Sequence, residues 1–259
     1  MILNLENFPR KSFSKHFLNS VHCEIGLESV ESKKIFDRAE EFKSKFLEIG
    51  FQSTDKVEVG TLSLEKKDEE SLNKISHSTQ FHGLVFKSQP PDKIVELNTS
   101  QLLMSIQNYE SFEDFFPIFQ KSVKIMEDTL TVRPVSKIGL KKVNKIEISG
   151  FKSIDSVCDI FNSNLLGGFR SGVGQLEDLV ATQESFVFKR NGITCFLTLN
   201  ISKKENNILV AILEFDCVVQ KNTTTKEVFE QILSDINEFH FDLFMWSITK
   251  KFRELLGDK

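Results

Sequence analysis

The chain has 259 residues, of which 40% are hydrophobic and 27% are charged, and its formal net charge is −4. This composition is typical of a folded water-soluble protein with a large core, and the negative charge argues against a general attraction to nucleic acid or anionic membranes. No run of 18 apolar residues occurs, so we expect neither a membrane-spanning helix nor a membrane partner.

In the first half of the chain, the spacing of apolar residues predicts four strands and two helices. Apolar side chains recur on one helical face from Ser32 to Gly50 and again from Ser111 to Leu130. Shorter apolar or alternating runs predict strands, and the prolines of residues 88–92 predict a turn. The expected strands are Ser20–Val30, Val57–Leu64, Phe81–Lys87 and Ile94–Gln107.

The second half follows a similar order and ends in a long helix. Asn191-Gly192 predicts a tight type I′ hairpin, because both central positions of that turn need a positive φ. A short helix is expected at Ser153–Phe161 and the long one from Thr224 to about Leu256. The expected strands are Val135–Ile148, Phe186–Arg190, Thr194–Ile201 and Ile208–Val219.

Two parts of the sequence recur at one offset of 113 residues. Ile25-Gly26-Leu27 matches Ile138-Gly139-Leu140, and the capping-box pattern Ser111–Asp114 matches Thr224–Glu227. The shared offset predicts an internal duplication. We therefore expect an α+β fold of two pseudo-repeated β-α-β(meander)-α halves, with antiparallel sheets, helices packed on the sheets and a long C-terminal helix. The expected organisation is a single domain, 1–259, with similar halves at about 16–132 and 133–257.

A basic strand is the first candidate binding site. It holds Arg133, Lys137, Lys141 and Lys145 in a chain that is acidic overall. Strand alternation places the three lysines on one face, where they can follow the phosphates of a nucleic acid or another polyanion. The alternative is a solvated strand face or an edge that lysines protect against strand addition.

A glycine-rich segment, residues 166–174, is the second candidate. Its successive backbone amides can hold an anion, and Arg170 adds a positive charge. The segment matches no phosphate-binding motif, so the alternative is a crossover loop without a ligand.

Patterns for catalysis and for metal binding are weak. The four cysteines have neither zinc-site spacing nor a secreted disulfide pattern, so we expect a cytoplasmic protein without a metal or another cofactor. His22 and Glu24 share a strand face, but such a pair more often forms a surface hydrogen bond than an acid–base couple. His240 and Asp242 lie two residues apart in a helix and point in different directions.

The terminal helix carries a wide apolar stripe that includes Leu243, Trp246 and Ile248. An exposed stripe of this size marks an interface. It therefore predicts either a homodimer or a protein partner at this helix, and the alternative is burial between the two halves.

Two segments resemble a sporadically distributed, uncharacterised prokaryotic family of proteins of similar length. Residues 138–146, Ile-Gly-Leu-Lys-Lys-Val-Asn-Lys-Ile, resemble the family pattern I-G-L-R-Y-x-N-R-I, with Lys141-Lys142 where the family has R-Y. Residues 246–257 resemble its C-terminal helix, which ends in T-x-x-x-R-E-L-x-G. The scattered distribution of that family suggests mobile genes, such as accessories of phage defence or of toxin–antitoxin systems.

These observations favour a non-catalytic cytoplasmic binding or accessory protein that contacts an anionic partner through the lysine row. One alternative is an enzyme that acts on nucleic acid or on a phosphorylated small molecule. The other is a protein–protein interaction module that uses the terminal helix.

Overall fold

The fold is α+β, as the sequence predicts, and is seen in a computed structural model. None of the helices in the described part of the chain combines the length and apolar composition needed to cross a bilayer. The structure describes residues 8, 13, 17–27, 29–65, 74–131, 134–148, 155–167, 180–204, 208–220 and 226–257.

The first half contains five strands and three helices within the described ranges. The expected helix that starts at Ser32 is interrupted at Arg38, and the stretch expected as Ile94–Gln107 forms two strands joined by a turn at residues 99–100. Ser111 caps the last of these helices by accepting a hydrogen bond from Asp114 N at 3.0 Å. The elements are β1 (Leu18–Leu27), α1 (Ser32–Asp37), α2 (Ala39–Glu48), β2 (Ser53–Glu65), β3 (Lys74–Lys87), β4 (Lys93–Asn98), β5 (Gln101–Ile106) and α3 (Phe112–Leu130).

The second half contains four described strands. Its hairpin at Asn191-Gly192 is confirmed, since the two residues have φ angles of 50° and 82°. The expected terminal helix is divided at Thr249, whose side chain accepts a hydrogen bond from Phe252 N at 3.1 Å and so caps a new helix. The elements are β6 (Pro134–Ile148), α4 (Asp155–Cys158), a 3₁₀ turn (Ser163–Leu165), β7 (Ala181–Arg190), β8 (Ile193–Lys204), β9 (Ile208–Gln220), α6 (Lys226–Ser247) and α7 (Lys250–Leu255).

The described strands form one antiparallel sheet in the order β2-β3-β4-β5-β1-β6-β9-β8-β7. By their internal contacts, the residues group into two compact units, which we describe separately. The N-terminal unit comprises Glu24–Ile106 and Glu110–Lys137, and the C-terminal unit comprises Met1–Cys23, Gln107–Tyr109 and Ile138–Lys259. The prediction of a single domain stays a prediction.

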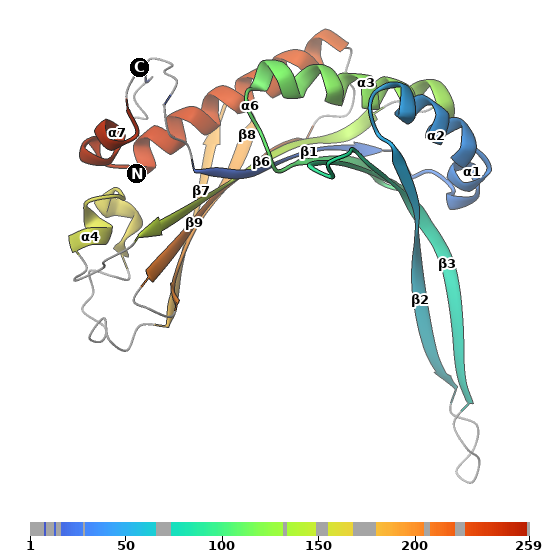
Figure 1. Ribbon diagram of the computed structural model, residues 1–259, viewed down its shortest axis with the longest axis horizontal. Coiled ribbons are helices and arrows are strands. Elements are labelled where there is room, and N and C mark those ends of the chain that lie inside the picture. The colour runs from blue at the N-terminus through green and yellow to red at the C-terminus, as the bar shows by residue number, and fades with distance from the viewer. Residues whose placement is uncertain are drawn as a thin grey trace. The chain divides into compact units, whose positions relative to one another are not determined.

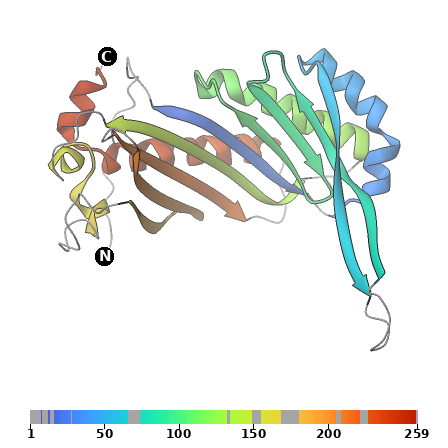
Figure 2. The same ribbon diagram turned by 60° about the horizontal axis from the view of Figure 1, so that its bottom comes forward.

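In the C-terminal unit, α6 covers one face of the strands (Figures 1 and 2). Alternate residues of β8 and β9 face this helix, and they are almost all apolar and fully buried because they form the core between helix and sheet. We call the opposite face of these strands the outer face. Residues of β8 and β9 that face the helix include Cys195, Leu197, Leu199, Leu213, Phe215 and Cys217.

In the N-terminal unit, α2 and α3 pack together and phenylalanine dominates the core. Phe42 and Phe46 of α2 and Phe86 of β3 are fully buried, and the rings of Phe46 and Phe86 stack at 3.9 Å between centroids. Lys45 joins the two helices, because its Nζ donates to Thr129 Oγ1 at 2.9 Å. Residues 83–87 of β3 pair with β4. The rest of β3 pairs with β2 alone, so the two strands continue as a two-stranded ribbon (Figure 1).

Gly83 occupies a position in β3 where the backbone of the neighbouring strand leaves no space for a side chain. A Cβ atom at this position would lie 2.3 Å from Leu97 O and 3.2 Å from Asn98 Cα. The register between β2 and β3 also shifts here, between Val57 and Glu58. Glycine is therefore required by the close approach of β4 rather than by a turn.

We expect the substitution Gly83→Ala to lower the free energy of unfolding by about 1–3 kcal/mol, because backbone atoms must move to accept the methyl group. Gly167→Ala is the matched control, since a Cβ there meets no atom within 4 Å. Urea unfolding followed by far-ultraviolet circular dichroism measures both variants. Equal stability of the two would contradict the close packing of β3 on β4.

Candidate functional site

The lysine row lies on one face of β6, as strand alternation predicts. Lys141 and Lys145 point to the outer face of the C-terminal unit, whereas Leu140 and Ile146 are buried on the other face. Lys137, at the start of the same strand, belongs to the N-terminal unit. Arg133 and Arg170 lie outside the described residues.

Each described lysine of the row forms an ion pair with a carboxylate. Lys141 Nζ lies 2.8 Å from Glu214 of β9, and Lys145 Nζ lies 3.1 Å from Glu147. In the N-terminal unit, Lys137 pairs with Glu24 of β1. Strand β8, which is separated from β6 by β9, adds a second cation, because its Lys204 Nζ lies 3.4 Å from Glu147. The lysines and their carboxylate partners thus form a network of alternating charges, which we call the charge lattice, rather than a continuous positive surface.

Glu147 keeps its negative charge near neutral pH. The hydrogen bond with Lys145, reinforced by Lys204, holds the pKa of Glu147 below its usual range. The outer face therefore carries three lysines, Lys141, Lys145 and Lys204, and two glutamates, Glu147 and Glu214. Asp216 lies on the same face, two residues after Glu214 in β9. The three carboxylates thus offset these three lysines, and Lys189 of β7, opposite Thr194, adds one more exposed cation to the same face.

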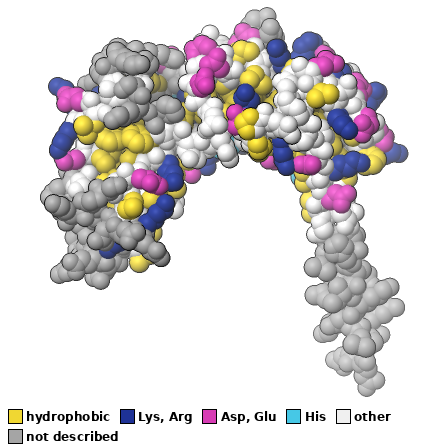
Figure 3. Space-filling model, viewed as in Figure 1, with side chains coloured by type: hydrophobic (Ala, Val, Ile, Leu, Met, Phe, Trp, Pro, Cys, Tyr) yellow, Lys and Arg dark blue, Asp and Glu magenta, His cyan; other side chains and the backbone are white. Residues whose placement is uncertain are grey.

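An exposed apolar pair lies on the same outer face. Val187 of β7 is directly opposite Phe196 of β8 in the strand register, and the two residues are 58% and 47% exposed. Thr194 and Thr198 flank Phe196 on its own strand and face the same way. On the C-terminal unit, Figure 3 shows hydrophobic side chains beside both positive and negative ones. We call this surface the outer patch. It consists of the apolar pair, the two threonines and the charged side chains of the lattice: Val187, Phe196, Thr194, Thr198, Lys141, Lys145, Lys204, Glu147 and Glu214.

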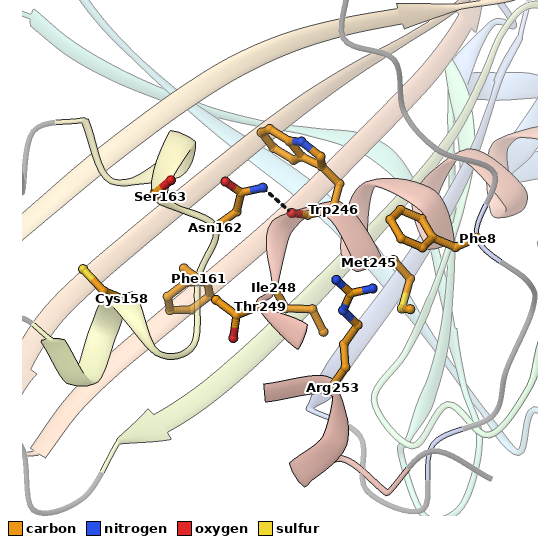
Figure 4. A pocket seen from close by; sticks show the side chains of 10 residues that line it. All are labelled: Phe8, Cys158, Phe161, Asn162, Ser163, Met245, Trp246, Ile248, Thr249 and Arg253. Carbon is orange, nitrogen blue, oxygen red and sulfur yellow. Dashed lines mark hydrogen bonds between the residues drawn. The ribbon is translucent and has the colours of Figure 1, made fainter. Parts of the chain in front are cut away.

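A pocket of about 470 Å³ lies between α4, the end of α6 and α7 (Figure 4). The Arg253 guanidinium lies 5.2 Å from the Phe8 ring centre, and Asn162 Nδ2 donates to Trp246 O at 2.9 Å across the pocket wall. Cys158 contributes a thiol to the described lining, which contains no Asp, Glu or His. Those described groups can bind a small anion but offer no acid–base pair.

The three residues predicted as an interface pack within the C-terminal unit. Leu243 is fully buried, Ile248 is 2% exposed, and the Trp246 ring contacts Phe188 of β7 edge-on at 5.4 Å. The apolar stripe of α6 thus covers the sheet of its own unit. A charged residue at position 243 would disturb this core.

The candidate acid–base residues have other partners. His22 Nε2 is hydrogen-bonded to Ser20 Oγ at 2.9 Å, while Glu24 pairs with Lys137. Asp242 pairs with Arg190 of β7, and His240 is buried on a different side of α6. No couple suited to proton transfer forms from these described residues.

The structure does bring together one set of soft metal ligands that the sequence analysis missed. Cys195 of β8 and Cys217 of β9 are directly opposite in the strand register, and His240 of α6 lies above them. Burial raises the pKa of the Cys217 thiol and lowers that of His240, so the thiol is protonated and the imidazole neutral. The strands expected at Thr194–Ile201 and Ile208–Val219 were the available signal, because a hairpin between them sets Cys195 opposite Cys217.

Comparison of the chain with protein-family models gives no match, and comparison with curated proteins gives none either. The resemblance of residues 138–146 and 246–257 to a prokaryotic family therefore stays a prediction.

Proposed function

We propose that this protein is a non-catalytic binding protein that contacts a protein partner through the outer patch of its C-terminal unit. The observation that carries the proposal is the exposed Val187–Phe196 pair, which lies among hydroxyl groups and charges of both signs. Protein interfaces characteristically have an aromatic or aliphatic centre with a polar rim. A partner surface with an apolar centre and charges of both signs fits this arrangement.

The charge lattice favours a protein over a nucleic acid. A phosphate that approaches Lys141 also approaches Glu214, and one near Lys145 meets Glu147. Nucleic-acid binding relies on cations that replace the counterions of the phosphates. The carboxylates offset most of the positive charge of this surface, so it gains less from that exchange and the lysine row gives the polyanion hypothesis less support than the sequence suggested.

We also infer that the chain arose by internal duplication. Ile25 and Ile138 hold equivalent positions in β1 and β6, which lie next to each other in the sheet order. From these two strands the order runs outward as β5, β4, β3, β2 on one side and β9, β8, β7 on the other. Both sequences also run from a strand through helix and meander to a long helix.

The proposal predicts that Phe196→Asp abolishes capture of the partner. A photo-crosslinking residue at Thr198 should capture a protein that the same residue at Gln231, an exposed position on α6, does not capture. With that partner purified, calorimetry should show at least about 30-fold weaker binding for Phe196→Asp, because a central hot spot contributes about 2 kcal/mol or more. Val59→Asp is the matched control, since Val59 is equally exposed, at 47%, but lies on β2.

Three other results would overturn the proposal or change the partner that it names. Salt-sensitive binding of labelled DNA or RNA, lost in a Lys141/Lys145/Lys204→Ala variant, would overturn it in favour of a polyanion. A native mass of a dimer that Phe196→Asp converts to a monomer would instead identify the partner as a second copy of this chain. Identical crosslinks from positions 198 and 231 would also contradict it.

A further inference from the structure

The buried cluster of Cys195, Cys217 and His240 is independent of the outer patch. Its three residues are 0%, 0% and 1% exposed, and their ligand atoms all lie within 4.8 Å of one another. In the described part of the chain, this is the one set of three or more His, Cys, Asp and Glu side chains that converges in this way. Two sulfurs come from adjacent strands and one ring nitrogen from the helix that covers them.

The imidazole is the second observation that points to a ligand. Among the described residues, neither Nδ1 nor Nε2 of His240 has a hydrogen-bond partner of good geometry, although both atoms are buried. Buried polar side-chain atoms nearly always have a partner, since leaving them without one is costly. The ring lies 6.2 Å from the Phe215 ring centre. A metal ion held with the two thiols would give one ring nitrogen its missing partner.

We propose that Cys195, Cys217 and His240 form a three-coordinate site for a monovalent copper ion. Metal–sulfur bonds of about 2.3 Å place donor atoms about 4 Å apart around a single ion, which agrees with the 4.8 Å limit of this cluster. Thiolate ligands select copper(I) and zinc over harder metals. Binding releases the two thiol protons to solvent, because the thiolate is the metal ligand.

The number of donors and the local charge favour copper(I) over zinc. Structural zinc takes four ligands in a tetrahedron, whereas copper(I) is stable with three, the number found among the described residues. Two thiolates and copper(I) carry a net charge of −1. Lys142 supplies a balancing cation nearby, since its Nζ donates to Asn237 Oδ1 at 2.6 Å and Asn237 precedes His240 by one helical turn.

The test is anaerobic titration of the full chain with copper(I) supplied as its bicinchoninate complex. Because the donors are enclosed, the titration is repeated on chain refolded from urea in the presence of the complex. We expect one copper per chain, and X-ray absorption should show two sulfur neighbours and one nitrogen. Cys195→Ser/Cys217→Ser should bind at least about 10-fold more weakly, since even residues that only support metal ligands change affinity by about 10- to 100-fold.

Controls separate site loss from misfolding. Cys23→Ser/Cys158→Ser removes the other two thiols and should leave copper binding unchanged. His240→Gln should lose the nitrogen neighbour while circular dichroism remains that of the parent. The proposal is overturned if refolded chain binds no copper, if the Cys195→Ser/Cys217→Ser variant binds as well as the parent, or if no nitrogen neighbour appears. Retention of zinc in preference to copper(I) would overturn the choice of metal.

Discussion

Replacement of Arg190 by methionine is expected to lower the free energy of unfolding by about 3–5 kcal/mol. The Arg190 guanidinium pairs with the Asp242 carboxylate, whose side chain is only 3% exposed, and it also lies 4.3 Å from the Phe239 ring centre. Arg190→Met keeps most of the apolar stem but leaves the carboxylate buried without its cation. An unpaired buried charge is far less stable than the same charge in water.

The double variant Arg190→Met/Asp242→Leu tests this explanation. Removal of both charges should recover most of the loss, because a buried ion pair and an apolar pair of similar volume often have similar stability. The surface pair Lys251–Asp159 provides the control: its side chains are 65% and 54% exposed, so Lys251→Met should change stability by less than about 1 kcal/mol. Urea unfolding at neutral pH measures all three variants. A double variant no more stable than Arg190→Met would contradict the argument.

Local chemistry made most elements predictable. The hairpin at Asn191-Gly192 was foreseen because few residue pairs accept two positive φ angles. The break in the terminal helix was not predicted, because it depends on a tertiary contact. Ile248 forms a strand bridge with Phe161, and this bridge separates α6 from α7 although the apolar stripe continues in the sequence. Periodicity alone cannot show such an interruption, because the residues on both sides keep helical spacing.

The candidate sites were also predictable only where they depend on local geometry. Alternation along β6 correctly placed Lys141 and Lys145 on one face, since it depends only on strand geometry. The pairing of Lys145 with Glu147 is local, because both lie on the same face of β6, whereas the partner of Lys141 was not foreseeable, because Glu214 comes from a strand far away in the sequence. The order of strands in the sheet decides which charges meet, and local patterns along the chain do not determine that order.

The cluster of thiols and imidazole was hidden for a related reason. Cys195 and Cys217 fit their apolar strands as ordinary buried residues, and His240 interrupts an apolar helix without a spacing motif. Only the packing of α6 on β8 and β9 brings the ring over the two sulfurs. Donors from three separate elements cannot be recognised by spacing along the chain.

Phe46→Ala is expected to destabilise the N-terminal unit by about 3–5 kcal/mol, as large-to-small changes of buried aromatic residues do. Phe46 is fully buried, stacks on Phe86 at 3.9 Å and meets Phe51 edge-on at 5.6 Å. The next residue gives a matched control: Leu47 is 57% exposed, and Leu47→Ala should change stability by no more than about 0.5 kcal/mol. Equal effects of the two substitutions would contradict the core assignment.

The same variant tests whether the chain unfolds as one domain. Trp246 is the only tryptophan and belongs to the C-terminal unit, so its fluorescence reports on that unit alone, whereas circular dichroism reports on both. If the units unfold together, Phe46→Ala moves both transitions to the same lower urea concentration, because a cooperative transition has one midpoint for every probe. If only the circular dichroism midpoint moves, the units are separate domains and the single-domain prediction is wrong.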